Sequence, residues 1–136
     1  MARPSAETIA RVPLFAGLEQ RDLDRIADSF KERTYAAGET IAREGHGGAG
    51  FFVIAEGTAK VSVQGEERST LGPGDYFGEI ALLDEGARTA TVTAETDMTT
   101  YAMTFWEFRP IVETDARIAW KLVQALAHRL REVDAR

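Results

Sequence analysis

The sequence predicts a mainly β fold, either a sandwich or a barrel, with helices flanking it at both ends of the chain. In the middle of the chain, short runs alternate apolar and polar residues, and glycine-bearing turns separate one run from the next. Alternation with a period of two is typical of half-buried strands, and many short strands in succession are typical of sandwiches and barrels. At both ends, apolar residues instead recur at the spacing of amphipathic helices.

One domain is expected from the length of 136 residues, which suffices for a single hydrophobic core and is marginal for two. The composition, 44% hydrophobic and 28% charged, is ordinary for a globular protein. We therefore expect a single domain over residues 1–136, with helices in residues 5–30, a barrel in residues 33–104 and further helices in residues 105–134.

The composition also excludes several kinds of protein. Without cysteine, the chain has no disulfide, thiolate metal site or cysteine nucleophile. It contains neither an apolar run near the roughly 20 residues of a membrane span nor a signal-peptide pattern, so a cytoplasmic protein is expected. A net charge of -6 argues against binding of nucleic acid, which depends on clustered Lys and Arg, but a local positive field would still attract a small anion.

Short helices are expected in residues 5–30, where apolar residues recur at helical spacing. Pro13 and Gly17 should interrupt them. The segment 23–30 gathers its apolar residues on one face, which we interpret as covering an end of the barrel, with binding of a partner as the alternative. That face contains Leu23, Ile26, Ala27 and Phe30.

Eight strands are predicted between the flanking helices. In the fourth, Val61 should point inward because Ala59, Val61 and Val63 share one face. The glycine-rich stretch 45–50 lacks the residues of a phosphate-binding loop, so we interpret it as a flexible connection. The strands are expected at residues 33–36, 40–43, 51–55, 58–64, 67–71, 75–77, 90–94 and 98–104.

The last third of the chain predicts two helices. Thr104 and Glu107 fit a capping box at the start of the first, and Pro110 should bend or restart that helix. Asp115 is expected to cap a longer helix. An apolar stripe on this helix should fold over the barrel as a lid or pack against the same helix of a second subunit. The stripe consists of Ile118, Leu122, Leu126, Leu130 and Val133.

The two tryptophans, Trp106 and Trp120, are expected to pack between helices and barrel. Trp120 lies opposite the predicted stripe, so it is also a candidate contact with another subunit or domain.

Residues 75–92, here called the cradle, carry the chemistry of a binding site. Gly78 supplies the backbone freedom to begin a short helical turn, whose first N–H groups, those of Ile80 and Ala81, are candidates for binding an anion. The planar guanidinium of Arg88 matches phosphate oxygens bidentately. Glu79 would repel a phosphate, so its expected partners are hydroxyls, and a ligand with a phosphate and a hydroxyl on one sugar fits the cradle.

The run Phe77-Gly78-Glu79-Ile80-Ala81-Leu82-Leu83, followed by Arg88-Thr89-Ala90, resembles the phosphate-binding cassette of the cyclic-nucleotide-binding domain family. The resemblance extends over nearly the whole chain through the glycine-punctuated segment 38–57. This family includes bacterial catabolite activator proteins, kinase regulatory subunits and nucleotide-gated channels. It implies an eight-stranded jelly-roll β-barrel with N-terminal helices and C-terminal lid helices.

The resemblance also implies a function: a non-catalytic sensor that binds cAMP in preference to cGMP and relays binding through its C-terminal helices. Glu79 would accept from the ribose 2′-hydroxyl and Arg88 would pair with the cyclic phosphate. Val61 would lie near the base, although a plain core valine has the same sequence pattern. The implied ligand-binding residues are Val61, Phe77, Gly78, Glu79, Ile80, Ala81, Arg88, Thr89 and Ala90. For the lid residue over the base, Arg129, Val133 and Asp134 remain open.

Partners are implied as well. In catabolite activators the last helix pairs across a dimer, so a homodimer or an effector domain contacted through the C-terminal helix is expected. Nothing resembling a helix-turn-helix follows this helix, which puts a transcriptional role in doubt and leaves either a domain that works alone or a piece of a larger protein.

Three alternatives to the sensor differ in the residues they require. A cupin-type metal site needs several histidines, and the chain has only His46 and His128. Acid–base catalysis by Glu79 lacks a second carboxylate or histidine in the expected pocket, so enzyme activity is not expected. The third is a degenerate member of the family that binds no nucleotide and mediates interaction or dimerisation, which the intact Glu79 and Arg88 disfavour. The bland interpretation of these two residues is a structural salt bridge that closes a loop.

Overall fold

Eight strands form within the part of the chain that the structure, a computed structural model, describes: residues 3–47, 50–83, 86 and 88–135. Every predicted strand is present, with ends within two residues of the expected positions. The strands are β1 (Lys31–Tyr35), β2 (Thr40–Ala42), β3 (Phe51–Glu56), β4 (Ala59–Val63), β5 (Glu66–Leu71), β6 (Tyr76–Phe77), β7 (Thr91–Ala94) and β8 (Met98–Met103).

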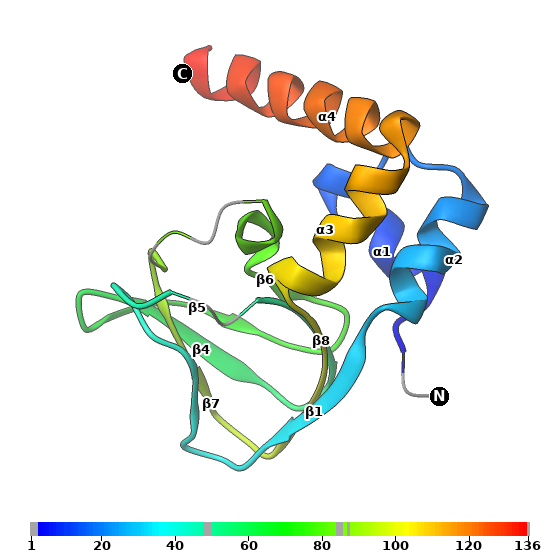
Figure 1. The fold of residues 1–136 in the computed structure, drawn as a ribbon. Helices are drawn as coiled ribbons and strands as arrows, with labels where there is room; N and C mark the ends of the chain where they lie inside the picture. The colour runs from blue at the N-terminus through cyan, green and yellow to red at the C-terminus, as the bar shows by residue number, and fades with distance from the viewer. Residues whose placement is uncertain (1–2, 48–49, 84–85, 87, 136) are drawn as a thin grey trace.

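The strands pair into two antiparallel sheets (Figure 1). Within the described residues, one sheet has the order β1-β8-β3-β6 and the other the order β2-β7-β4-β5. Neighbouring strands are mostly distant in sequence, so the chain passes repeatedly from one sheet to the other, as in a jelly roll. The predicted mainly β, jelly-roll fold with flanking helices is therefore confirmed.

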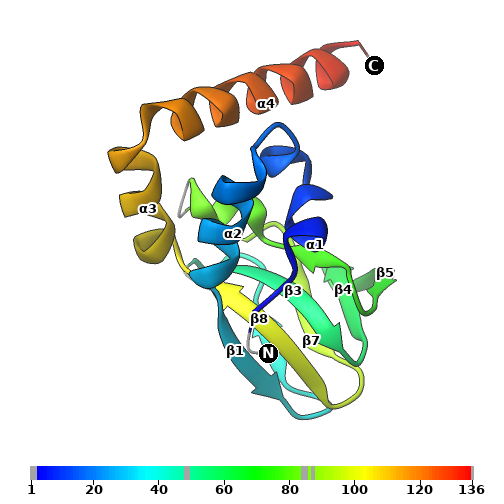
Figure 2. The ribbon, with the colours of Figure 1, turned by 90° about the vertical axis from the view of Figure 1, so that its right-hand side faces the viewer.

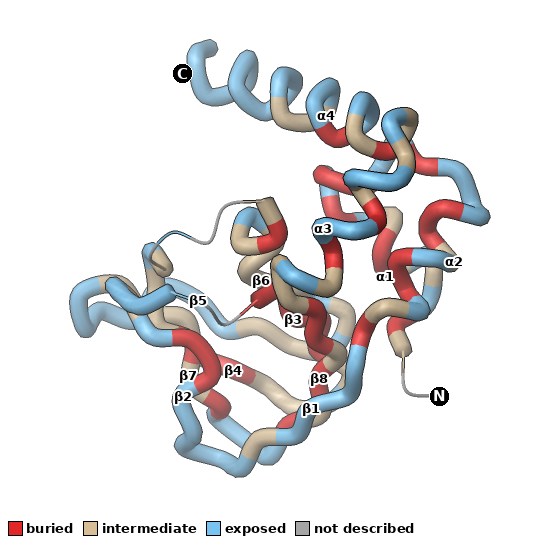
Figure 3. Tube along the Cα trace, in the orientation of Figure 1, coloured by how far each residue is buried: buried red, intermediate tan, exposed pale blue. Residues whose placement is uncertain are grey.

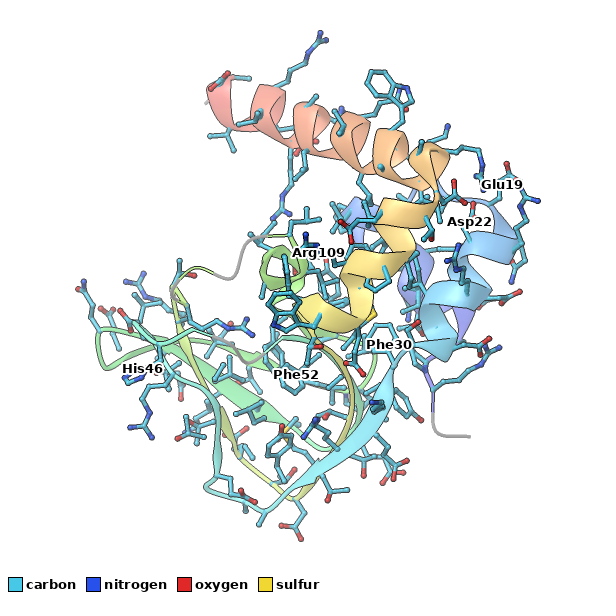
Figure 4. The ribbon with its side chains drawn as sticks, viewed as in Figure 1. Glu19, Asp22, Phe30, His46, Phe52 and Arg109 are labelled. Carbon is cyan, nitrogen blue, oxygen red and sulfur yellow. The ribbon has the colours of Figure 1, made fainter. Side chains whose placement is uncertain are left out.

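Strand β3 lies between the two hydrophobic clusters of the protein. Its residues alternate between two hydrophobic clusters, because successive side chains of a strand point to opposite faces. Phe51 and Val53 pack with the helices, whereas Ile54 and Phe52, which is labelled in Figure 4, pack between the sheets. Both faces of the β1-β8-β3-β6 sheet are thus covered at β3, which accounts for its continuous apolar sequence.

The N-terminal helices cover the outer face of this sheet. They are α1 (Ala6–Ala10), the 3-10 turn η1 (Pro13–Phe15) and α2 (Gln20–Asp28), with breaks next to Pro13 and Gly17 as predicted. Phe15 is fully buried, with ring centroids 6.0 Å from Phe51 and 5.8 Å from Phe108. The predicted apolar face of residues 23–30 lies in the same cluster.

Helix α3 (Phe105–Thr114) begins at the predicted capping box: Glu107 N donates to Thr104 Oγ1 at 3.2 Å, and Thr104 N donates to Glu107 Oε1 at 2.9 Å. The helix does not restart at Pro110, because α3 continues through this residue to Thr114, and the alternative of a bend stays a prediction. The proline ring tolerates a helical φ and removes one backbone hydrogen bond. Burial of Phe108 and Ile111 on either side stabilises the helix across that loss.

Helix α4 (Ala116–Asp134) begins at Asp115, whose Oδ1 accepts from Arg117 N at 3.1 Å, as predicted. The Arg117 side chain joins this end of α4 to α2, because its Nη1 and Nη2 donate to the two carboxylate oxygens of Asp22 at 2.7 and 2.8 Å (Figure 4). Asp22 is buried, and these hydrogen bonds lower the pKa of its carboxyl group. The start of α4 is therefore held by a charge-assisted, bidentate pair.

The predicted apolar stripe of α4 divides into two parts. Ile118 and Leu122 are buried and Leu126 packs against them, whereas Leu130 and Val133 are more than 60% exposed. The distal turns of α4 accordingly project away from the other helices (Figures 2 and 3).

The expectation that the tryptophans pack between helices and barrel is also wrong. Trp106 and Trp120 are 62% and 61% exposed. Trp106 instead lies edge-on to Phe105 and beneath the Arg109 guanidinium on the surface of α3, so helical spacing alone did not identify the buried face.

Candidate ligand-binding site

The cradle begins with a backbone conformation that requires glycine. Gly78, which follows β6, has φ 84° and caps the 3-10 turn η2 (Glu79–Leu82). This left-handed region is open to glycine at no steric cost. A Cβ at Gly78 would also collide with Arg88 Nη1 and with the Gly50 carbonyl oxygen. Glycine is therefore needed twice here, for the turn and for the close approach of Arg88.

A cavity of about 410 Å³ lies between η2 and the β2-β7-β4-β5 sheet. Its volume is within the range of small-molecule sites. All nine residues predicted to bind ligand line its wall, including Val61, which faces it from β4 as expected. The wall consists of Ala42, Val61, Phe77, Gly78, Glu79, Ile80, Ala81, Gly86, Arg88, Thr89, Ala90 and Val92.

Arg88 places a partly buried cation at this wall. Its Nη2 donates to the Gly50 carbonyl oxygen, which orients the guanidinium. Its Nε is buried and donates to no described residue. Burial lowers the pKa of Arg88 and the charge of Glu79 opposes that effect, yet arginine stays protonated at any ordinary pH. The result is a permanent positive charge with an unsatisfied donor, an environment that favours an anion.

Glu79 supplies a negative charge at the wall of the cavity. Its side chain is 14% exposed, and its Oε1 is 3.5 Å from Nη1 of Arg129 on α4. Among the described residues, Glu79 forms no ion pair with Arg88, so the structural salt bridge considered from the sequence is not the observed arrangement. The carboxylate retains lone pairs for a hydroxyl donor.

Comparison with known proteins gives a family match over a segment that includes these site residues. The model of the family described as "Cyclic nucleotide-binding domain" matches residues 32–115, more than half of the chain. The chain belongs to the cyclic nucleotide-binding domain family.

Individual relatives agree. The "Cyclic AMP receptor protein" of Thermus thermophilus is 35% identical over 127 residues, covering 90% of this chain and 59% of the relative. The "cGMP-dependent protein kinase, isozyme 1" of Drosophila melanogaster is 40% identical over 97 residues, covering 66% of this chain and 13% of that kinase. The chain thus spans about three fifths of the first relative and a small part of the second.

Solved structures match as well. The crystal structure of the N-terminal domain of a transcriptional regulator from Streptomyces coelicolor A3(2) superposes with a TM-score of 0.85 at 32% identity, covering 94% of this chain and 92% of that one. The match includes nearly the whole of both chains, so the flanking helices are part of the similarity.

Within this cyclic nucleotide-binding domain, one predicted anion donor is already used. The N–H of Ala81 donates to the Gly78 carbonyl oxygen at 3.0 Å, closing the first 3-10 bond of η2. No described residue accepts from the N–H of Ile80. The difference arises because a 3-10 turn pairs residues three apart, and so occupies the third N–H that an α-helical turn would leave free.

The loop at residues 45–50 has a larger part in the site than its sequence predicted. Gly45 N donates to Arg88 O, and Arg88 N donates to His46 O, both at 2.9 Å. Together with the Gly50 carbonyl, these bonds position both the backbone and the guanidinium of Arg88. The interpretation as a mere connection is therefore wrong for the described residues of the loop. The glycines of that segment indicate an unusual backbone conformation, but the sequence does not show that its bonding partner is Arg88, about 40 residues further along the chain.

Neither a metal site nor a membrane-spanning helix is found in the described part of the chain. Residues 3–47, 50–83, 86 and 88–135 contain no cluster of three or more His, Asp or Glu side chains suited to a metal ion. Over the same residues, no helix combines the length and apolar composition that crossing a membrane requires.

Proposed function

We propose that the chain is a non-catalytic sensor module, comprising residues 1–136, that binds a cyclic nucleotide, cAMP in preference to cGMP, in the cavity between η2 and the β4–β7 sheet. The observation that carries this proposal is the Arg88 guanidinium, which is held against the cavity wall with a buried donor that no described residue satisfies. A cyclic phosphate supplies both the missing acceptor and the opposite charge.

The remaining roles follow from position. Glu79 accepts from the ribose 2′-hydroxyl, while the N–H of Ile80 and the Thr89 and Ala90 residues complete the phosphate shell. The apolar side chains of Val61 and Phe77 lie beside the base. Ala81 contributes to the wall through its small side chain, because its N–H is bonded within η2. The preference for cAMP is supported by the name of the Thermus relative, whereas the Drosophila kinase keeps cGMP as the second candidate.

Of the three candidates for the lid residue, Arg129 has the strongest support. It already reaches the cavity wall at Glu79, whereas Val133 and Asp134 are exposed on the last turn of α4. We propose that ligand binding shifts α3 and α4 relative to the sheets. Such a shift requires the ligand to bind the two arrangements of these helices with unequal affinity.

The outer side of α4 supports a proposal about partners. Four exposed residues recur there at intervals of three and four, the spacing of a coiled-coil seam. We call this set the exposed apolar stripe, and it consists of Trp120, Val123, Ala127 and Leu130. A second copy of the chain, or an effector domain, would bury it.

Thermal unfolding with cAMP, cGMP and the open-ring nucleotide 5′-AMP tests the ligand assignment. A ligand at a hundred times its Kd stabilises the folded state by about 2.7 kcal/mol. For a domain of this size, that corresponds to a rise in Tm of about 10 °C. We expect the largest rise with cAMP and little with 5′-AMP. If neither cyclic nucleotide raises the Tm at millimolar concentration, the sensor proposal is wrong and the non-binding interaction module takes its place.

A further inference from the structure

Helix α4 crosses over the α1–η1 segment (Figures 1 and 2). Residues of these elements line a second hollow, separate from the ligand cavity. Its volume is about 710 Å³, larger than that of the ligand cavity. We call it the basic groove. One wall consists of Arg11, Pro13, Ala16 and Gly17, and the α4 wall consists of Lys121, Gln124, Ala125, His128, Arg129 and Glu132.

The charge of the basic groove is opposite to that of the chain. Arg11, Lys121 and Arg129 carry positive charges at neutral pH, whereas Glu132 is the one carboxylate in the walls described for the groove. The chain as a whole carries a net charge of -6. Positive charge is therefore concentrated in this hollow, and a hollow of one sign focuses its field on an approaching ligand of the other.

Two of these cations lack a compensating charge. Arg129 pairs with Glu79 at 3.5 Å, and His128 lies 3.0 Å from Glu132. Among the described residues, neither Arg11 nor Lys121 forms an ion pair, and the Arg11 guanidinium, which lies beside Gly74, donates to the Thr8 hydroxyl at 3.4 Å. The end of the groove at Arg11 and Lys121 therefore presents free positive charge.

The shape of the groove indicates an extended occupant. Its α4 residues occupy one helical stripe from 121 to 132, which at 1.5 Å per residue is about 16 Å long. Pro13, Ala16, Gly17 and Ala125 give it small, apolar surfaces. Lys121 and Arg129 are about 12 Å apart along the helix axis. Carboxylates four residues apart on an extended chain are separated by about 13 Å, which matches this distance.

We propose that the basic groove binds an extended, acidic peptide segment of a partner protein, with one carboxylate between the unpaired Arg11 and Lys121 and a second at Arg129, whose guanidinium it shares with Glu79. Glu132 repels a third acidic residue at the far end, which sets the register of the segment. A single inorganic anion would use only one end of the groove. Arg11 and Lys121 lie outside the wall of the ligand cavity, and Arg129 is the residue that the groove shares with the proposed nucleotide site.

The groove and the exposed apolar stripe lie on opposite sides of α4. At 100° per residue, the exposed apolar stripe is centred about 150° around the helix axis from the six groove residues of α4. Pairing of two chains through that stripe leaves the basic groove open, so the acidic segment and a second copy are separate partners.

The test measures fluorescence anisotropy of a labelled decapeptide with two glutamates four residues apart in a background of glycine, serine and alanine. Its control is the same peptide with glutamines. We expect the full chain to bind the glutamate peptide at least about tenfold more tightly at low salt, and this difference to shrink as salt is raised. The double variant Arg11→Glu/Lys121→Glu should lose about tenfold in affinity for the glutamate peptide. Arg129 is left intact because it also contacts Glu79.

Matched controls separate the groove from net charge. Arg68 is exposed on β5, and Arg68→Glu and Lys60→Glu together change the charge as much as the double variant does. Equal binding of the glutamate peptide to both double variants would overturn the proposal. So would full displacement of the peptide by inorganic phosphate at matched charge concentration, which would indicate a simple anion site. Sedimentation that shows a dimer for the parent and a monomer for Arg11→Glu/Lys121→Glu would assign the groove to a second copy instead. The Tm response to cAMP, measured on the same variants, reports separately on the ligand cavity.

Discussion

Nη1 of Arg129, on the last helix, lies 3.5 Å from Oε1 of Glu79, at the edge of the ligand cavity. The pair joins two segments that are 50 residues apart in sequence. Because a carboxylate has about four lone-pair sites, Glu79 can accept from a sugar hydroxyl while it keeps this contact. The distal half of α4, otherwise exposed, is therefore tethered to the site where the proposed ligand binds.

Loss of this tether should loosen the end of α4. Exposed ion pairs contribute about 0.2–1 kcal/mol, so Arg129→Ala should speed amide hydrogen exchange in residues 127–134 by about 1.4-fold to 5-fold. Arg131→Ala, on the same helix but without an ion pair among the described residues, is the control. Equal exchange rates in the two variants would show that the pair does not hold the helix.

Arg88→Ala should abolish most cyclic-nucleotide binding. Truncating one partner of a buried, hydrogen-bonded charge pair costs about 2–5 kcal/mol, which corresponds to about 30-fold to several thousandfold in Kd. Titration calorimetry with cAMP measures the change, and Arg68→Ala, an exposed arginine on β5, provides the comparison. An Arg88→Ala variant with the affinity of the parent would refute the role of Arg88.

Gly78→Ala should damage both stability and binding. A non-glycine residue in the left-handed region costs about 1–2 kcal/mol. At Gly78 the added Cβ also meets Arg88 and the Gly50 carbonyl, so Arg88 must move. Gly65→Ala isolates the backbone cost, because Gly65 has φ 79° and no heavy atom within 4 Å of an added Cβ. We expect Gly65→Ala to lower the free energy of unfolding by that amount and to leave the affinity for cAMP unchanged. Gly78→Ala should lower the free energy of unfolding by more than Gly65→Ala does, and it should also lower the affinity for cAMP. Equal losses in the two variants would contradict the crowding at Gly78.

Asp22→Asn should destabilise the fold by about 1.5–3 kcal/mol, the range for hydrogen bonds to charged groups. The lower half of that range is expected because about a third of the Arg117 side chain is exposed to solvent. Urea denaturation measures the change. Asp24→Asn, on the same helix but bonded to Gln20 rather than to a cation, should have a small effect.

The same pair predicts how stability depends on pH. The pKa of Asp22 is lowered from its ordinary value of 3.8, mainly by the hydrogen bonds from Arg117. Its contribution is therefore complete above that ordinary value and is lost as pH falls from 3.8 through the lower pKa of the folded state. Asp22→Asn should lack this part of the acid sensitivity, so the stabilities of parent and variant should converge at low pH. A difference that persists unchanged below both pKa values would contradict the role of the charge.

Leu130→Glu should weaken self-association if the exposed apolar stripe joins two chains. A buried charge in such an interface lacks a partner and is costly. Sedimentation equilibrium should then give a lower association constant for Leu130→Glu, whereas Glu132→Gln, which lies in the basic groove on the other side of the helix, should behave like the parent. A parent that stays monomeric at high concentration would instead favour an effector domain as the partner of the stripe.

Local sequence signals predicted most of the fold because they depend on neighbouring residues. Alternation and glycine turns located the strands to within two residues, and the capping box at Thr104 and the cap at Asp115 are short-range hydrogen-bond patterns. The cradle was recognisable for the same reason, since Gly78, Glu79 and Arg88 lie close together in the sequence. Their binding roles stay predictions.

Contacts between distant segments could not be predicted in this way. The partners of Arg88 are Gly45, His46 and Gly50, and the partner of Glu79 is Arg129. Each pairing is set by how the sheets and helices assemble. Helix α4 likewise carries apolar residues on more than one face, so periodicity could not show that Leu130 is exposed while Leu122 is buried.

The bidentate pair of Arg117 with Asp22 clamps only the first turn of α4. Beyond that pivot the helix continues to Asp134 as an arm about 26 Å long. A rotation of about 10° at the clamp would carry the distal end about 4.5 Å, most of one helical pitch. If ligand binding shifts the corner between α3 and α4, as proposed above, this arm would magnify a small adjustment into a larger displacement at its far end.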